Sequence, residues 1–178
     1  MVMNNRKIVI YNTPNNCVQF EFIPKGSLNA NQASACYMQM ACYSGDSINW
    51  TNSVKIELTM TMLIDMIAIL HQLDGNRFYQ NIGKNQNKHL KFGVSKSERY
   101  QNGLWIEINE KIGQDFKLSK PRIYVSASGR LGDLISLKAF MIGALNSLLQ
   151  EQTGMTYSVS EILRDLLNTS IISSLQQD

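Results

Sequence analysis

Apolar and polar residues alternate along three segments in the first third of the chain. Successive side chains of a β-strand point to opposite faces of a sheet, so a period of two is typical of a strand that buries one face. In the clearest segment Val18, Phe20 and Phe22 point one way. Gln19 and Glu21 point the other way. Alternation predicts strands at residues 17–23, 34–43 and 54–58. Residues 7–11 are also predicted as a strand, because they are rich in β-forming residues.

The apolar period changes at Thr59, which is a candidate for the start of a helix. Apolar residues then recur at spacings of three and four up to Leu73, the pattern of a helix with one buried stripe, and Asp74-Gly75 ends it. The same order of elements follows a second time. Alternation predicts strands at residues 89–95, 104–109 and 122–126, after a short strand candidate at 77–80. Apolar residues then predict a second helix at 131–150.

Four strands and a helix, twice in succession, indicate an α+β fold of the form ββββα repeated. The connections between strands are as short as those of hairpins, so both four-stranded sheets are expected to be antiparallel. The sheets and helices should bury their apolar faces against one another. We therefore expect one domain over residues 1–150, with halves at about 7–75 and 76–150, and a tail over residues 151–178.

The tail contains the signature of an extra C-terminal helix. Ser158 and Glu161 have the spacing of a capping box, in which each side chain accepts a hydrogen bond from the other residue's backbone N–H. An apolar stripe follows, formed by Ile162, Leu163, Leu166, Leu167, Ile171 and Leu175. Two interpretations stay open. The helix packs on its own domain, or it docks on a neighbouring subunit or gates the binding surface.

The composition is that of a folded chain with a mildly basic balance. Of the 178 residues, 44% are hydrophobic and 17% are charged, which excludes a disordered chain. The net charge of +3 permits a polyanionic partner without requiring one. The three cysteines, Cys17, Cys36 and Cys42, form no CxxC pair, so neither a disulfide framework nor a zinc site is expected.

The sequence predicts neither export nor insertion into a membrane. The first ten residues lack an apolar run long enough for a signal peptide. The most apolar stretch, residues 60–73, is interrupted by Asp65 and His71 and is too short to span a bilayer. We therefore expect a soluble protein of the cytoplasm, either of a bacterium or, for a phage-encoded protein, of its host.

The chain carries no recognisable catalytic or cofactor-binding motif. Its two histidines, His71 and His89, lack the HExxH spacing, and neither a nucleophile elbow nor a Walker-type phosphate loop is present. Residues 129–132 are similar to a phosphate-binding turn but lack its third glycine, which favours a plain strand-to-helix turn. We expect no enzyme activity, no cofactor and no metal site.

Aromatic and basic residues share the solvent-facing sides of the predicted strands. A base stacks on an aromatic ring whatever its identity, while lysine and arginine hold the phosphate chain. Such a surface suits single strands, because a duplex hides the faces of its bases. The same residue types are enriched at subunit interfaces, which is the alternative interpretation. The residues on or beside this surface are Tyr37, Tyr43, Trp50, Lys55, His89, Lys91, Trp105, Arg122 and Tyr124.

Three stretches resemble the Whirly-type single-stranded nucleic-acid-binding proteins. Ile48-Asn49-Trp50, followed by the 54–58 strand and the first helix, is similar to the family's aspartate- or asparagine-Trp pair before its equivalent strand. Residues 76–80 look like the family's aromatic strand after that helix, and the 124–126 strand likewise leads into a long apolar helix. The resemblance covers about residues 7–150. The plant members' lysine-glycine-lysine-alanine motif is absent, which favours a prokaryotic or viral relative.

The resemblance implies paired sheets that cross like blades, helices that form the core of a tetramer, and DNA bound along the sheets with little sequence preference. We therefore expect an oligomeric single-stranded DNA-binding protein that acts in replication, recombination or DNA transfer. The alternatives are an RNA-binding or RNA-annealing protein of the same fold, and a structural or assembly protein without nucleic acid. The expected contacts are Tyr37, Tyr43, Trp50, Lys55, Tyr79, Lys91, Trp105, Arg122 and Tyr124.

Overall fold

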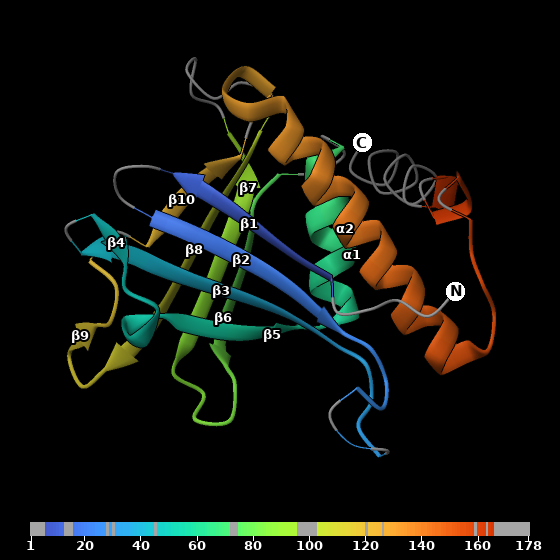
Figure 1. Cartoon of the computed structure of the whole chain (residues 1–178), viewed down its shortest axis with the longest axis horizontal. Coiled ribbons are helices and arrows are strands. Elements are labelled where there is room, and N and C mark those ends of the chain that lie inside the picture. Colours follow the sequence, from blue (N-terminus) through green and yellow to red (C-terminus); the bar gives the residue numbers. More distant parts are fainter. Residues whose placement is uncertain are drawn as a thin grey trace, which may run out of the picture.

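The computed structural model describes residues 6–12, 16–27, 29, 31–44, 46–71, 75–95, 103–119, 121–125, 127–158, 160–162 and 164–165 (Figure 1). The elements in chain order are β1 (Arg6–Asn12), β2 (Asn16–Ile23), β3 (Ala35–Ser44), β4 (Ser47–Ile48), the 3-10 turn η1 (Trp50–Asn52), β5 (Val54–Leu58), α1 (Met60–Leu70), β6 (Arg77–Ile82), β7 (Lys88–Val94), β8 (Leu104–Ile112), β9 (Asp115–Phe116), β10 (Arg122–Val125) and α2 (Ala127–Thr153).

The first sheet contains the strands predicted in the first half of the chain, in the order β1-β2-β3-β5. All its strand pairs are antiparallel, as expected, with Val18 opposite Met40 and Met40 opposite Val54. The short β4 adds a fifth strand that the sequence did not predict. β3 spans ten residues and β5 only five, so the end of β3 that extends past β5 is free to pair with β4.

The second sheet has the order β10-β8-β7-β6 and is also antiparallel. It gains a fifth strand for the same reason, because β8 has nine residues, β10 has four, and β9 pairs with the free end of β8. In Figure 1 the strands of the two sheets run at a steep angle to one another, with both helices at one end of them. The predicted pair of antiparallel four-stranded sheets with helices is therefore confirmed, with one short strand added to each sheet.

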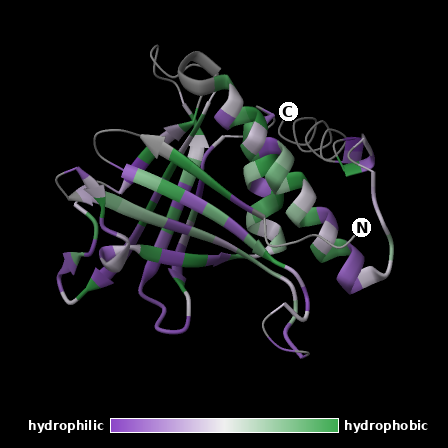
Figure 2. Ribbon diagram, viewed as in Figure 1, coloured by the Kyte–Doolittle hydropathy of each residue, from purple (hydrophilic) through white to green (hydrophobic). Residues whose placement is uncertain are grey.

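The apolar faces of the two sheets and the helices form one core. Along the strands hydrophobic and hydrophilic residues alternate, as Figure 2 shows. Phe20, Met38 and Phe92 are fully buried, because every second residue of each strand points inward and these inward-pointing residues are apolar. α1 begins where the sequence predicts, with the Thr59 side chain accepting a hydrogen bond from the Met62 N–H at 3.3 Å. Its last helical residue is Leu70, three residues before the predicted end.

α2 is longer than predicted, since it begins at Ala127 rather than at residue 131. Residues 129–132 therefore lie inside the helix and do not form a turn before it, which corrects the sequence-based interpretation. The segment Leu131–Thr153 is long and apolar enough to cross a membrane by length and composition alone, a feature that the sequence analysis missed. In this structure, however, the helix packs beside α1 and buries Leu137, Met141 and Leu145 in the core (Figure 1).

The start of the tail forms the predicted capping box. The Ser158 N–H donates to the Glu161 carboxylate at 2.7 Å, and the Glu161 N–H donates to the Ser158 hydroxyl at 3.1 Å. Ile162 follows and is buried in the core, so this part of the tail packs on its own domain. Leu163 and the later residues of the apolar stripe lie outside the described residues.

Leu137→Ala is expected to lower the free energy of unfolding by about 2–5 kcal/mol, because it leaves a cavity under a fully buried position of α2. Ser136→Ala is the control on the same helix, since that side chain is exposed, and it should change stability by less than about 0.5 kcal/mol. Urea denaturation measures the free energy of unfolding of both variants and of the wild type in aqueous buffer. Equal effects would contradict the packing of α2 as a core helix.

Candidate nucleic-acid interface

The register of the second sheet aligns four side chains in one row on its outer face. Phe78 lies opposite Lys91, Lys91 opposite Glu107, and Glu107 opposite Arg122. The next row contains Gly93, Trp105 and Tyr124. Charged side chains of three strands thus lie beside Phe78 in one row, and two aromatic side chains lie in the next row. We call this surface the aromatic-basic face, defined by Phe78, His89, Lys91, Trp105, Glu107, Arg122 and Tyr124.

Glu107 is the centre of the charges on this face. Its carboxylate accepts hydrogen bonds from the Arg122 guanidinium at 2.6 Å and 3.0 Å, and it lies 3.6 Å from the Lys91 ammonium. Each cation also covers a ring. Lys91 Nζ is 4.9 Å from the centroid of Phe78, and Arg122 Cζ is 4.6 Å from that of Trp105. The Lys91 and Arg122 side chains are 43% and 46% exposed, so a ligand can reach both cations from solvent.

Gly93 gives Trp105 its place on the face. A Cβ on Gly93 would lie 2.9 Å from the indole Nε1 of Trp105 and 1.9 Å from the side-chain oxygen of Asn76. Only a glycine at this position lets both side chains reach across β7 without a shift. Asn76 therefore belongs to the surroundings of Trp105, a role that the sequence analysis did not assign to it.

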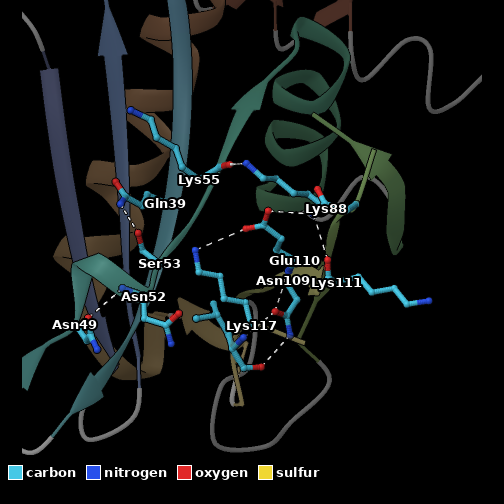
Figure 3. Close-up of polar contacts among 12 residues, drawn as sticks. Gln39, Asn49, Asn52, Ser53, Lys55, Lys88, Asn109, Glu110, Lys111 and Lys117 are labelled. Atoms are coloured by element: carbon cyan, nitrogen blue, oxygen red, sulfur yellow. Dashed lines mark hydrogen bonds and ion pairs between the residues drawn. The ribbon is translucent and has the colours of Figure 1, made fainter. Parts of the chain in front are cut away.

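A pocket of about 470 Å³ opens on the same face beside Phe78 and His89. The ring of His89 stacks against Phe78 at 6.3 Å and meets the edge of Phe116 at 6.1 Å. The buried Asn109 holds the chain after β9, since it donates to the Leu118 carbonyl and accepts from the Leu118 N–H, both at 2.9 Å (Figure 3). A pocket of this size with aromatic walls suits a flat organic ring.

Phe78 and Phe116 are absent from the predicted contacts, although they are 53% and 56% exposed on or beside this face. Residues 77–80 include adjacent aromatic residues, Phe78 and Tyr79, so alternation alone does not say which of the two faces solvent. The strand register would have shown it, because Phe78 pairs with Lys91, whose outward direction the sequence predicts.

Tyr79 lies on the inner face of the second sheet, apart from the other predicted contacts. Its ring stacks on the buried Phe92 at 6.0 Å, and its hydroxyl donates a hydrogen bond to Asp65 of α1. Burial raises the pKa of the Tyr79 hydroxyl far above its usual value, and the hydrogen bond to Asp65 and the charge of that carboxylate raise it further. The structure therefore makes Tyr79 a link between β6 and α1 on the inner face of the sheet, and its role as a nucleic-acid contact stays a prediction.

The first sheet brings together two of its predicted contacts. Lys55 Nζ lies 4.2 Å above the ring of Tyr37 and 3.6 Å from the Glu21 carboxylate. Burial raises the pKa of the Tyr37 hydroxyl, and the negative charges of Glu57 and Glu21 add to the shift. Tyr37 and Lys55 also line a second pocket, of about 480 Å³, at the edge between the two sheets.

Lys88 joins the two sheets at this edge. Its ammonium donates a hydrogen bond to the Lys55 carbonyl at 2.7 Å (Figure 3). Gly83, in the β6–β7 turn, also lines the second pocket and adopts a φ of +81°, a conformation that favours glycine. The β6–β7 hairpin therefore presents the second pocket on one side and the aromatic-basic face on the other.

The remaining predicted contacts, Tyr43 and Trp50, lie near the β4 end of the first sheet. Tyr43 is half-buried and pairs with Ile48 of β4. Trp50 is half-buried in η1, whose shape is fixed by the Asn52 N–H donating to the Asn49 side chain at 3.0 Å (Figure 3). Neither residue lies in the row of Tyr37, which is opposite Glu57, or in the row of Lys55, which is opposite Gln39.

The titratable groups of the described residues do not form a metal site, since no three His, Cys, Asp or Glu side chains come together there. Burial raises the pKa of the Cys17 thiol to about 11 and that of Cys36 to about 12, so both stay protonated. Burial, followed by the charge of Lys138, lowers the pKa of His71, which lies at the end of α1.

Comparisons with known proteins identify the class of fold. No protein-family model matches the sequence, and no curated protein sequence matches it. The solved structure of WHY1 from Arabidopsis thaliana matches with a TM-score of 0.55 at 15% identity, covering 86% of this chain and 96% of that one. PBF-2, described as a plant transcriptional regulator, matches with a TM-score of 0.54 at 15% identity, covering 86% of this chain and 95% of that one. The predicted resemblance to the Whirly proteins is therefore confirmed at the level of the fold.

Gly93→Ala is expected to displace the Trp105 indole and to destabilise the protein by about 1–3 kcal/mol, because the added methyl group overlaps Trp105 and Asn76. Urea denaturation measures the stability, and acrylamide quenching of Trp105 in a Trp50→Phe background should show a more accessible indole. Gly75→Ala is the control, since Gly75 is exposed outside the helices and strands and an added Cβ would meet no neighbouring atom within 4 Å. Unchanged quenching and stability in Gly93→Ala would contradict this role of Gly93.

Proposed function

We propose that the chain binds single-stranded nucleic acid across the outer faces of its two sheets, with little dependence on base sequence. One observation carries this proposal: the row in which Phe78, Lys91, Glu107 and Arg122 lie side by side, with Trp105 under the guanidinium. Each of the two cations of this row lies over a ring, so groups for phosphates and groups for bases are next to one another on adjacent β-strands. About 4.8 Å separates neighbouring strands, so the row is long enough for several groups of a nucleic-acid chain.

The chemistry of this face favours single strands over duplexes. A stacked base contributes roughly 1–3 kcal/mol and requires a free ring face on both partners. Bases in a duplex are stacked on one another and present only their edges. The pocket beside Phe78, His89 and Phe116 is large enough, at about 470 Å³, to admit one unpaired base. Stacking does not read base identity, which accounts for the expected lack of sequence preference.

DNA is the proposed natural strand, with a role in replication, recombination or DNA transfer, and RNA is the alternative. The likeness of this fold to that of the Whirly proteins supports a nucleic-acid partner. We further propose that the protein is an oligomer, with a tetramer as the expected form. Leu131 and Ile135 support this, since they leave apolar side chains 54% and 57% exposed on α2.

The test is fluorescence anisotropy of a labelled single-stranded oligonucleotide titrated with the wild-type protein and with Trp105→Ala. Removal of the indole is expected to weaken binding by about 1–3 kcal/mol, or roughly 5- to 150-fold. Ile112→Ala is the matched control on the same strand, because it removes a 57% exposed apolar side chain outside the face. Its affinity should equal that of the wild type.

Wild-type binding should also weaken as salt rises, with a slope of about −0.7 in log K per phosphate neutralised. An RNA oligonucleotide of the same sequence, used as competitor, then separates the two candidate strands. An affinity that survives Trp105→Ala while thermal stability falls would mean that Trp105 is structural, and the face would lose its proposed role. Failure of the wild-type protein to bind any single strand at low salt would overturn the proposed function.

A further inference from the structure

We propose that Glu107 competes with the phosphates of the nucleic acid, so that the space between Lys91 and Arg122, filled by a carboxylate in the free protein, is a phosphate-binding position. This inference rests on the proposed function and deepens it. It assigns one place to one group of the ligand, and it makes Glu107 a residue that limits affinity.

The geometry around Glu107 is that of an anion held by two cations. One carboxylate oxygen accepts two hydrogen bonds from Arg122, at 2.6 Å and 3.0 Å, and the other lies 3.6 Å from Lys91 Nζ. Arginine binds carboxylate and phosphate with the same fork of donors. Glu107 itself is 22% exposed and lies deeper than the two cations, which are 43% and 46% exposed. An incoming phosphate therefore meets the cations first and can draw them away from the carboxylate.

The same cations cover the rings on which bases would stack. Lys91 lies over Phe78 at 4.9 Å, and Arg122 lies over Trp105 at 4.6 Å. A base cannot take either ring face until the cation has moved aside. Binding is therefore an exchange of partners. The cations leave Glu107 and the rings and bind phosphates, and bases take the place of the cations on the rings. Glu107 opposes both halves of this exchange, because it holds both cations in place.

The first sheet repeats the arrangement on a smaller scale. Lys55 lies over the ring of Tyr37 at 4.2 Å and is held by Glu21 at 3.6 Å. The three residues come from three neighbouring strands, β2, β3 and β5, as those around Glu107 come from neighbouring strands of the second sheet. One carboxylate holds one ring-covering cation here, whereas Glu107 holds two.

Glu110, on the same strand as Glu107, provides the contrast. It pairs with Lys117 at 3.7 Å, and Lys117 is only 23% exposed. It also accepts a hydrogen bond from Asn87 at 3.1 Å. Its contacts therefore connect the loop before β7 with the segment after β9. Replacing Glu110 by glutamine changes the net charge of the protein by the same amount as replacing Glu107, without releasing a cation on the aromatic-basic face.

The experiment compares wild type, Glu107→Gln, Glu21→Gln and Glu110→Gln by anisotropy with a labelled single-stranded DNA oligonucleotide over a series of salt concentrations. Two exposed ion pairs no longer compete in Glu107→Gln, so its affinity at low salt should rise about five- to thirtyfold. The net charge of the Lys91, Arg122 and Glu107 cluster rises from +1 to +2, which should steepen the salt slope by about 0.7. Glu21→Gln should bind about two- to fivefold more tightly, and Glu110→Gln should match the wild type within about twofold.

The outcomes separate this inference from the proposed function. If the wild type binds but Glu107→Gln binds no more tightly, the inference fails while the proposed function stands. If Glu110→Gln gains as much as Glu107→Gln, the effect is one of net charge and the inference fails as well. If neither the wild type nor Glu107→Gln binds any single strand, the proposed function is wrong and the inference falls with it. Thermal melting of each variant confirms that the compared proteins are folded.

Discussion

Backbone hydrogen bonds between β6, β7, β8 and β10 hold these strands in one antiparallel register, and every feature of the candidate site depends on it. The register turns Leu90, Phe92 and Ile106 inward to the core and Lys91 and Glu107 outward. A slip of one residue would exchange the two faces, which would place charges in the core and aliphatic side chains in water. The burial of the inner face therefore stabilises the order of the side chains on the outer face.

In the free protein both cations of the outer face are paired with one carboxylate. Lys91 and Arg122 serve Glu107 as ion-pair partners and cover Phe78 and Trp105, so the surface keeps its rings and charges partly satisfied before any ligand arrives. The contacts are weak and exposed, which makes them easy to exchange. The same arrangement around Lys55 on the first sheet shows that a cation over a ring, paired with a carboxylate, occurs on both sheets.

Most of the fold could be predicted from the sequence, because alternation with a period of two is a direct consequence of burying one side of a strand. Most of the eight long strands follow from it, and both helices follow from apolar residues at spacings of three and four. β4 and β9 do not, since two-residue strands carry no periodicity and arise from unequal strand lengths. The start of α2 was missed because Gly129 and Gly132 are typical of a turn, yet both lie within the helix.

The candidate site could be predicted only in strands where apolar and polar residues alternate clearly. Lys91, Trp105, Arg122 and Tyr124 were placed on the outer face because apolar residues flank each of them. Phe78 and Tyr79 are adjacent aromatics, and tertiary contacts rather than periodicity decide that Tyr79 turns inward to Asp65. The contacts across strands, including the position of Glu107 between two cations, depend on register, which local sequence patterns do not contain.

Photo-crosslinking with a single-stranded oligonucleotide that carries 5-iodouracil tests the central claim most directly, since this base reacts with aromatic residues on which it is stacked. The cross-linked peptides are identified by mass spectrometry. The account predicts cross-links to Trp105 and to Phe78, both of which should disappear when unlabelled single strand is added in excess. Cross-links confined to α2 or to the tail, with none on the outer face of either sheet, would contradict it.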